Sequence, residues 1–386
     1  MSVTMNGKRI VYISLIDLGE MATGVAKKIM AQCYAMHSLG FDVDVIYMTE
    51  TGMTVWNIDS NQRDSFPLKK DKGMLFYSSV IKYIRKKADY YDYAYVRLPY
   101  PSLKIFSYPL VFSLKKTFAS NLIVEIPTFP FIQESKTFKS RCYNLYLLFF
   151  SLIFRKKIDV ISYMGAQRDK IWGGKAIRIF NSVPLNKVRV KEHIAHEGIN
   201  FIGVAQLAYW HGYDRVITGI AEYQKMNGAV PVSFHIVGNS LSGDGGELQR
   251  LKELAQKLGV KDSVIFHGSM HGEKLDALFD SMDIAVDSLG RHRSGNDYNC
   301  SLKSKEYCAR GIPFIKSHLD DSFLGTGYYY QCSADDLPID MSDIVTWFYE
   351  SKFESRTLRE YAEKVFDWRV QLSKVFGKDV LHSDKA

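Results

Sequence analysis

Between Asn200 and Ser317, short apolar runs alternate with segments of helical spacing, and this alternation constrains the fold more than any other feature of the sequence. A strand that is followed by a helix can pair in parallel with the next strand, because the helix carries the chain back across one face of the sheet. The second half therefore predicts a parallel sheet with both faces covered. The expected strands are Asn200–Val204, Val232–Val237, Val264–Phe266, Ile284–Ser288 and Pro313–Ser317, and the expected helices are Tyr213–Lys225, Glu247–Leu258, Lys274–Ser281 and Leu302–Arg310.

The first half repeats this pattern less regularly. It opens with a strand at Arg9–Ile16, a helix at Gly24–Leu39 and a second strand at Val43–Met48. A chain of 386 residues exceeds what one core usually supports. We therefore expect an α/β protein with two Rossmann-like domains, residues 1–185 and 186–350, whose parallel sheets face each other across a cleft, and a helical tail at residues 351–386 that packs back toward the first domain. Further elements are expected as strands at Tyr93–Arg97, Leu122–Ile126 and Val160–Ser162, and as helices at Met74–Lys87, Leu103–Thr117 and Ser140–Arg155.

Charge is divided unevenly between the two halves. Residues 1–190 contain 28 Lys and Arg against 14 Asp and Glu, a net charge of +14. Residues 191–386 contain 22 against 28, a net charge of −6, and the whole chain is at +8. A basic first domain indicates an anionic partner. No Arg-Gly repeat or zinc-ligand spacing favours nucleic acid, so we expect none.

Cysteine usage and the amino terminus indicate a reducing compartment. The five cysteines are odd in number, scattered and without a CxxC pair, which argues against a disulfide framework and against a metal knuckle. The apolar run Ile10–Leu18 is short and ends in an acidic region, so it is typical of a first strand rather than of a signal peptide. We therefore expect a cytoplasmic protein.

The stretch Asn296–Ile315 combines groups suited to an anion with one carboxylate, Glu306. Lys303 and Lys305 lie in the first turn of the expected helix Leu302–Arg310, where the helix dipole disfavours cations, so an anion at that end would relieve the conflict. A diphosphate fits this requirement. The boundaries of the helix follow from its caps, which are Asn299 and Ser301 before it and Gly311 and Pro313 after it.

Seven segments occur along the chain in this order: TGVAKKI, VEIPT, FNSVPL, FIGVAQLAYWHGYDRVI, FHIVGN, VIFHGSMHGEKLDALFDSMDIAV and KEYCARGIPFI. In kind and order they resemble the segments of the retaining family 4 glycosyltransferases of GT-B fold that work in bacterial polysaccharide biosynthesis. The resemblance implies that the second domain binds a UDP- or GDP-linked sugar and the first binds an acceptor, with transfer of the sugar to a hydroxyl and retention at the anomeric carbon. We expect no cofactor, and no metal either, because basic and helix-terminal groups are available for the phosphates.

The chain departs from the family where the donor is held. The family has two glutamates eight positions apart; Glu306 matches the second, and Tyr298 stands at the first, beside Asp297. Asp297 could reach the sugar hydroxyls, or Tyr298 and Asn296 could hold the sugar through neutral hydrogen bonds. We therefore expect Glu306 and Asp297 to be the catalytic pair.

The family's two phosphate-binding cations are also replaced, by Gln206 and His211. His211 could contact a phosphate as an imidazolium, or it could bond only its own loop. The loop GRHRSGND could supply the missing charge or could be a solvated basic loop. The donor-binding residues that we expect are Gln206, His211, Gly238, Asn239, His271, Arg291, Arg293, Tyr298, Ser301, Leu302 and Lys303.

Acceptor binding is expected at Gly24, Glu125 and Thr128, although Pro127 stands where the family has a histidine. The triplet Asp42-Val43-Asp44 spells a metal-binding DxD, but it opens a strand, so we interpret it as structural.

The segment Tyr143–Phe154, YNLYLLFFSLIF, has a broad apolar face and basic flanks. It is too short to span a bilayer, so we expect it to dock the protein on the anionic inner face of the cell membrane, where a lipid-linked saccharide would be the acceptor. The alternative is a core helix. Two alternatives to transfer are a nucleotide-sugar-binding subunit without activity and a GT-B-like nucleotide-sugar 2-epimerase.

Overall fold

The computed structural model describes residues 7–18, 24–68, 72–87, 90–98, 114, 121–129, 142, 145, 157–240 and 246–377. The chain divides into two compact units: unit 1 is Met1–Ser182 with Asp367–Ala386, and unit 2 is Val183–Phe366. The chain therefore passes from one unit to the other twice. The expected tail at residues 351–386 does not form a separate body, because its first part belongs to unit 2 and only its end, from Asp367, belongs to unit 1.

The described strands of unit 1 form a nine-stranded sheet in the order β4-β3-β2-β1-β5-β6-β7-β9-β8. The strands β2, β1, β5, β6, β7 and β9 pair in parallel, whereas β3, β4 and β8 pair antiparallel at the two edges. The expected parallel sheet is thus confirmed in its central strands, and the antiparallel strands β3, β4 and β8 extend it at the edges. The bounds are β1 Arg9–Ser14, β2 Asp42–Met48, β3 Gly52–Asn57, β4 Arg63–Pro67, β5 Tyr93–Arg97, β6 Leu122–Phe129, β7 Val160–Gly165, β8 Lys170–Ile171 and β9 Gly174–Arg178.

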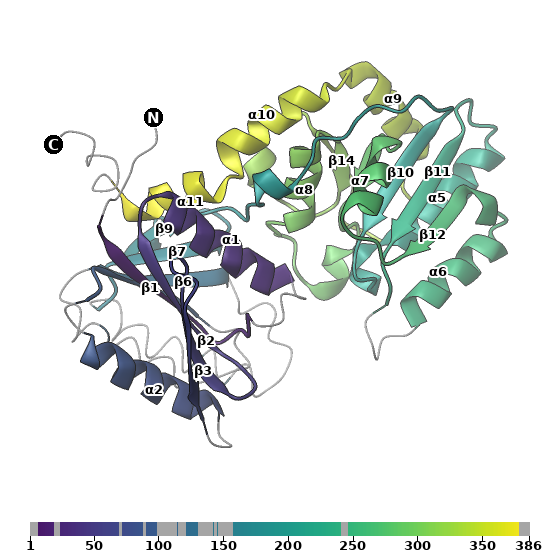
Figure 1. Cartoon of the computed structure of the whole chain (residues 1–386). Helices are drawn as coiled ribbons and strands as arrows, with labels where there is room; N and C mark the ends of the chain where they lie inside the picture. The colour runs from purple at the N-terminus through teal and green to yellow at the C-terminus, as the bar shows by residue number, and fades with distance from the viewer. Residues whose placement is uncertain are drawn as a thin grey trace. The chain divides into compact units, whose positions relative to one another are not determined.

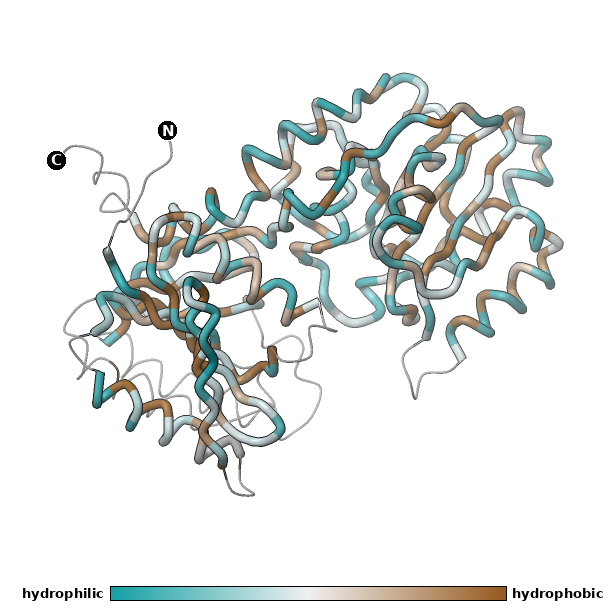
Figure 2. Tube along the Cα trace, viewed as in Figure 1, coloured by the Kyte–Doolittle hydropathy of each residue, from teal (hydrophilic) through white to brown (hydrophobic). Residues whose placement is uncertain are grey.

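Helices cover both faces of this sheet, and the alternation of side chains along β1 shows why (Figure 1). Ile10 and Tyr12 pack on one face with α1 (Gly24–Ser38) and α11 (Trp368–Phe376), whereas Val11 and Ile13 pack on the other face with α2 (Lys72–Lys86). Successive residues of a strand point to opposite faces, so a strand buried on both sides is apolar at every position. In Figure 2 hydrophobic colour occurs along these strands and is interrupted at their polar residues.

Unit 2 has a six-stranded sheet in the order β12-β11-β10-β13-β14-β15, and every described pair in it is parallel. The α/β architecture expected from the alternation is confirmed. The strands are β10 Ile199–Val204, β11 Val232–Val237, β12 Val264–Gly268, β13 Ile284–Val286, β14 Phe314–Lys316 and β15 Tyr329–Gln331. The helices are α5 Tyr213–Lys225, α6 Gly246–Lys257, α7 Glu273–Asp280, α8 Leu302–Arg310, α9 Met341–Ser351 and α10 Ser355–Val365.

Two glycines let loops at the carboxyl edge of this sheet approach closely. Gly238 has a φ of 130°, and a Cβ there would lie 1.7 Å from the carbonyl oxygen of Ala205. Gly212 has a φ of 67°, and its Cβ would lie 2.6 Å from the backbone nitrogen of Gly290. A side chain at either position would clash with the neighbouring loop and force the two loops apart.

The predicted helices Leu103–Thr117 and Ser140–Arg155 lie outside the described residues, apart from the single positions 114, 142 and 145. The same holds for the apolar segment Tyr143–Phe154, so its predicted membrane face stays a prediction. No helix in the described ranges is both long enough and apolar enough to cross a bilayer.

Candidate functional site

The candidate site of unit 2 lies at the carboxyl edge of its sheet, where β10, β13 and β14 end and α8 begins. Parallel α/β sheets bind their ligands at this edge. Ser301 caps α8, since its hydroxyl oxygen accepts a hydrogen bond from the backbone nitrogen of Lys303 at 3.2 Å. Gly311, with a φ of 75°, ends the helix. The predicted bounds of α8 are therefore confirmed, and the start of the helix is fixed at the sheet edge.

Asp287, the residue that follows β13, is the buried centre of this edge. Its carboxylate accepts hydrogen bonds from the Ser301 hydroxyl at 3.0 Å, from the Ser304 hydroxyl and from the backbone nitrogen of Ser288 at 2.7 Å, and it pairs with the Lys303 ammonium at 3.2 Å. Burial alone would raise the pKa of Asp287, but Lys303, His318 and the serine hydroxyls hold this pKa well below its ordinary value. Asp287 is therefore charged, and it fixes the first turn of α8.

The two lysines at the start of α8 are neutralised in different ways. Lys305 is fully buried, pairs with the carboxylate of Asp320 and lies 4.6 and 5.1 Å from the ring centres of Phe323 and Phe366. The charge of Lys305 is balanced inside the protein. Lys305 therefore does not need a diphosphate as its counter-ion, contrary to the expectation from the sequence.

Lys303 remains accessible from outside. Its side chain is 22% exposed, and its ammonium group donates to the Ser288 hydroxyl at 3.1 Å beside the contact with Asp287. An ammonium group has three N–H donors, so these two described partners leave one donor for a ligand. Burial lowers the pKa of Lys303, and Asp287 opposes this shift.

His211 is neutral and bonds its own loop. Its Nδ1 accepts a hydrogen bond from the backbone nitrogen of Ala208 at 3.1 Å, so the neutral ring carries its proton on Nε2. Burial, together with the charges of Lys303 and Arg291, places the pKa of His211 well below its ordinary value. Of the two roles considered from the sequence, the contact with Ala208 favours a bond within its own loop, and a contact with phosphate stays a prediction. The ring can still donate one neutral hydrogen bond beside Lys303.

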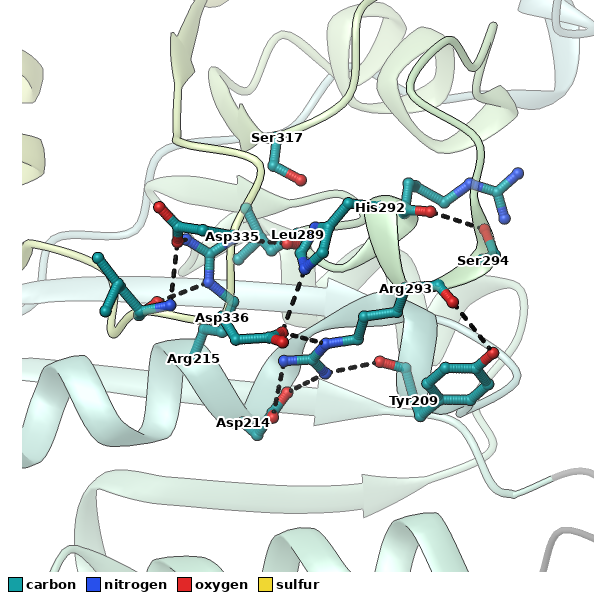
Figure 3. A network of polar contacts seen from close by, with 12 residues as sticks. Tyr209, Asp214, Arg215, Leu289, His292, Arg293, Ser294, Ser317, Asp335 and Asp336 are labelled. Atoms are coloured by element: carbon teal, nitrogen blue, oxygen red, sulfur yellow. Dashed lines mark hydrogen bonds and ion pairs between the residues drawn. The ribbon is translucent and has the colours of Figure 1, made fainter.

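Arg293 holds the loop after β13 to the start of α5 (Figure 3). Its guanidinium group bonds both carboxylate oxygens of Asp214, at 2.9 and 3.0 Å, the carboxylate of Asp336 at 2.6 Å and the carbonyl oxygen of Tyr209 at 2.8 Å. All three nitrogens thus have acceptors in the protein. Arg293 was predicted to bind the donor, but this geometry makes it a clamp within unit 2.

Arg215, which follows Asp214 on α5, holds the loop after β13 and the loop after β15 (Figure 3). Its buried guanidinium group donates to the carbonyl oxygens of Leu289 at 2.6 Å, Ser333 at 3.0 Å and Leu337 at 2.7 Å, and to the Asp335 carboxylate at 2.9 Å. The loop after β13 and the loop after β15 are therefore held in fixed positions. No sequence pattern indicates this role, because the partners lie 74 to 122 residues away.

A pocket of about 330 Å³ lies between these loops and the loop after β14. Arg291 and Asp297, both predicted site residues, line it. Tyr298 does not, and its hydroxyl donates instead to Asp321 at 2.5 Å. The lining residues are Arg291, His292, Asn296, Asp297, Ser317, His318, Leu319, Gln331, Cys332 and Ala334.

Glu306 lies on the second turn of α8, away from this pocket. Its side chain is 40% exposed and accepts a hydrogen bond from Arg310 at 3.0 Å, and Arg310 also bonds Asp276 at 2.6 Å. The carboxylate is therefore partly accessible but paired. Asp297 is exposed. The described contacts do not join the expected catalytic pair, so its role stays a prediction.

Of the remaining predicted donor residues, Leu302 begins α8 beside Lys303, and the others follow the ends of β10, β11 and β12. Gln206 and His271 are exposed and Leu302 is half-buried. Asn239 donates through its side chain to the Ser269 hydroxyl at 3.0 Å and accepts through its carbonyl oxygen from Leu207 at 2.8 Å, directly after Gly238. These residues share the correct edge of the sheet, and no described contact links them to Lys303.

In unit 1, Glu125 is fully buried, which argues against the predicted contact with an acceptor. Its carboxylate accepts hydrogen bonds from Arg97, from the Tyr95 hydroxyl at 2.6 Å and from the Gln32 side chain at 2.9 Å. Glu125 is thus the internal counter-ion of Arg97. Thr128 is half-buried at the end of β6, and a Cβ at Gly24, the first residue of α1, would meet no atom of the described residues within 4 Å.

The DxD triplet has the structural role that its position at the start of β2 predicted. The side chain of Asn57 donates to Asp42 at 2.8 Å and to Asp44 at 2.9 Å, and the Tyr91 hydroxyl also donates to Asp44. Both carboxylates thus hold β2 to neighbouring segments of unit 1.

Asp287 and His318 were not identified from the sequence. A signal existed, because the run Asp287-Ser288 follows an apolar strand directly, and polar residues at the carboxyl ends of parallel strands face the ligand edge. His318 likewise follows β14, two residues after its end. The sequence alone does not show that Asp287 and His318 lie close together. They do so because β13 and β14 are neighbouring strands that pair directly.

Comparisons with known proteins place this site in a family. Residues 186–317 match the family described as "Glycosyl transferases group 1". The chain is similar to alpha-monoglucosyldiacylglycerol synthase of Streptococcus pneumoniae (strain ATCC BAA-255 / R6), with 26% identity over 146 residues. The matched part is 38% of this chain and spans about a third, 32%, of the length of that relative.

Solved structures resemble nearly the whole chain. Sucrose-phosphate synthase from Thermosynechococcus elongatus matches with a TM-score of 0.68 at 15% identity, over 97% of this chain and 100% of that structure. A glycosyltransferase from Rickettsia africae matches with a TM-score of 0.67 at 12% identity, over 97% and 99%. HepE from Anabaena in complex with UDP-glucose matches with a TM-score of 0.57 at 12% identity, over 96% and 99%. Residues 186–317 therefore match the glycosyl transferases group 1 family, and nearly the whole chain has the GT-B fold of these solved structures.

Proposed function

We propose that this chain is a retaining glycosyltransferase of family 4 type that moves a sugar from a nucleoside-diphosphate sugar to an acceptor hydroxyl. The observation that carries the proposal is the position of Lys303. Its ammonium group lies at the start of α8, at the carboxyl edge of a parallel sheet, and Asp287 holds it with one donor left for a ligand. An anion at this point would meet both the ammonium group and the positive end of the helix dipole.

The relatives support a nucleotide-sugar donor and an acceptor of lipid character. HepE, of the same fold, is described in complex with UDP-glucose, and the streptococcal relative is named for the synthesis of a glucosyl diacylglycerol. For this chain we propose a UDP- or GDP-linked donor and a lipid-linked saccharide as acceptor. The net charge of +14 in residues 1–190 and the segment Tyr143–Phe154 support work as a peripheral protein on the cytoplasmic face of the membrane.

In the proposed reaction the bond between the anomeric carbon and the diphosphate oxygen breaks, and the acceptor oxygen bonds that carbon on the same face. The acceptor proton goes to the departing diphosphate, so no protein base is required. Lys303 and the Nε2–H of His211 would stabilise the charge that develops on the leaving oxygens, which is where preorganised donors contribute most. We propose that this chemistry needs no metal ion.

The test is transfer from a panel of UDP- and GDP-linked sugars by the wild-type chain and by Lys303→Met. We expect the variant to lose at least about 100-fold in turnover, as is usual when one donor to a developing oxyanion is removed. Lys257→Met, at an exposed position in the last turn of α6, is the matched control. Full activity of Lys303→Met would contradict the assignment of Lys303. A wild-type chain that neither binds nor consumes any nucleotide sugar would overturn the function itself.

A further inference from the structure

A row of alternating charges joins the loops at the carboxyl edge of the sheet in unit 2. At its centre Arg293 bonds Asp214 at the start of α5 and Asp336 in the loop after β15 (Figure 3). Arg250 extends the row to α6, because its Nη1 lies 3.6 Å from Oδ2 of Asp214. The carboxylate of Asp214 therefore lies between two arginines, one from the helix after β11 and one from the loop after β13.

Glu247 fixes the direction in which the Arg250 side chain points. Its carboxylate is buried and accepts hydrogen bonds from Nε and Nη2 of Arg250, both at 2.8 Å. The third nitrogen, Nη1, is thus left to face Asp214. A lysine has one compact charge in place of this planar fork and could not hold both carboxylates at once. Glu247 also stands in the first turn of α6, where the helix dipole favours a carboxylate, so Arg250 is tied to the start of that helix.

The start of α6 is bonded in turn to the loop that follows β11. The backbone nitrogen of Leu248 donates to the Ser240 hydroxyl at 2.9 Å, and Ser240 directly follows Asn239, a predicted donor residue. Arg250 therefore connects the loop after β11, through α6 and Asp214, with the loop after β13. The sheet order is β11-β10-β13, so the ends of β11 and β13 are two strand spacings apart, about 10 Å.

This connection matters for a ligand that touches both loops. Such a ligand binds with full affinity only if the distance between the loops is fixed beforehand, because ordering the loops at the moment of binding costs free energy. A ligand that touches one loop does not incur this cost.

We propose that Arg250 is a positioning residue that holds the loop after β11 and the loop after β13 at the spacing that a nucleoside diphosphate bridges. This rests on the proposed function and concerns the same site, with the diphosphate at Lys303 and the nucleoside toward the end of β11. Arg250 itself touches neither part of the ligand. Its loss should therefore weaken ligands that span both loops and leave smaller ligands unaffected.

The experiment compares the affinities of the wild-type chain and of Arg250→Gln for UDP, uridine and inorganic diphosphate, or for GDP, guanosine and diphosphate if the chain prefers guanine. NMR titration suits it, since weak binding is also recorded. Glutamine can still donate to Glu247, so the variant leaves this buried carboxylate with a partner. We expect UDP to bind about fivefold more weakly, the upper range for a partly exposed ion pair, and uridine and diphosphate to change less than about twofold.

Two further variants accompany this measurement. Asp214→Asn with Arg250→Gln should lose no more affinity for UDP than Asp214→Asn alone, because both changes break the same contact. Lys257→Met, at an exposed position in the last turn of the same helix, is the matched control and should bind UDP as the wild-type chain does. The Arg250 side chain is 45% exposed, so we expect the variants to fold, and urea titration checks this.

Three results would overturn the positioning role. One is an unchanged affinity for UDP in a folded Arg250→Gln chain. Another is an equal loss for UDP and inorganic diphosphate, which would make Arg250 a direct phosphate ligand. The third is an additive loss in the double variant. A wild-type chain that binds neither UDP nor GDP would instead refute the proposed function, and the positioning role would fail with it.

Discussion

At the scale of single residues, the buried carboxylate of Asp287 balances the charge of Lys303. Replacing it by Asn removes the partner of Lys303 and weakens the hydrogen bonds of Ser301 and Ser304. Loss of one member of a buried ion pair costs about 3 kcal/mol or more, because the other charge is left without compensation. We expect Asp287→Asn to lower the free energy of unfolding of unit 2 by about this amount, measured by urea titration.

The double variant Asp287→Asn with Lys303→Met should regain part of that loss, since it leaves no charge behind. A change below about 0.5 kcal/mol in the single variant, the range usual for surface substitutions, would contradict the role given to Asp287.

Several histidines with lowered pKa values should make unit 2 less stable in mild acid. Burial lowers the pKa of His235 and of His318 to about 4, and it also lowers that of His211 and His267. The unfolded chain therefore binds more protons than the folded chain between about pH 6.5 and pH 4. Stability is full above about pH 6.5 and falls as the pH drops through this window, by at most about 1.4 kcal/mol per pH unit for each histidine.

Thermal unfolding between pH 7.5 and pH 4.5 measures this loss. His235→Phe, which removes one partner of the 2.9 Å contact between His235 Nδ1 and His267 Nε2, should flatten the dependence. A melting temperature that does not change over the window would show that these rings do not titrate as described. The carboxyl group of Asp287, whose folded pKa lies below its ordinary value, contributes only at lower pH.

At the scale of elements, Arg293 joins α5 to the loop after β13. Variants of this contact can show whether Arg293 binds the donor or positions the loop. A lysine cannot span Asp214, Asp336 and the Tyr209 carbonyl at once, because it has one compact charge in place of a planar fork. We expect Arg293→Lys to weaken donor binding about five- to tenfold, equal to about 1–1.4 kcal/mol, through movement of Arg291 and His292.

Asp214→Asn separates the two roles. If Arg293 were a phosphate ligand, removing this carboxylate would leave donor affinity unchanged or raise it. If Arg293 is a clamp, Asp214→Asn should weaken binding as Arg293→Lys does. Arg356→Lys on α10, whose side chain is 89% exposed and paired with Glu360, controls for the substitution itself.

Elements with clear boundary residues could be predicted from the sequence. The bounds of α8 follow from Ser301 and Gly311, because caps and breaks act locally. The edge strand β4 was missed, since all five of its residues are exposed and show no buried alternation. The pairing of Lys305 with Asp320 was also missed. It depends on how α8 meets the loop after β14, and a single sequence does not contain that information.

At the scale of the whole molecule, unit 1 depends on residues from the far end of the chain. In α11, Trp368, Leu372, Val375 and Phe376 are buried against α1 and the sheet. Each buried side chain of this size contributes about 1.5–3 kcal/mol, so the four together contribute about 6–12 kcal/mol, which is comparable to the usual stability of a whole domain.

We therefore expect a chain that ends at Phe366 to keep unit 2 folded and to lose unit 1. Limited proteolysis followed by mass spectrometry should recover a stable fragment near Val183–Phe366. The full-length chain is the control. Survival of both units in the shortened chain would show that α11 is dispensable.

The two passages of the chain between the units also have a consequence for synthesis. All the strands described in unit 1 emerge from the ribosome before unit 2, yet their last packing partner emerges after it. Unit 2 is continuous in sequence and can fold as soon as Phe366 is available. Unit 1 must wait with the apolar face of α1 uncovered until α11 has been translated, so that exposed face is the part of the nascent protein for which a chaperone would be needed.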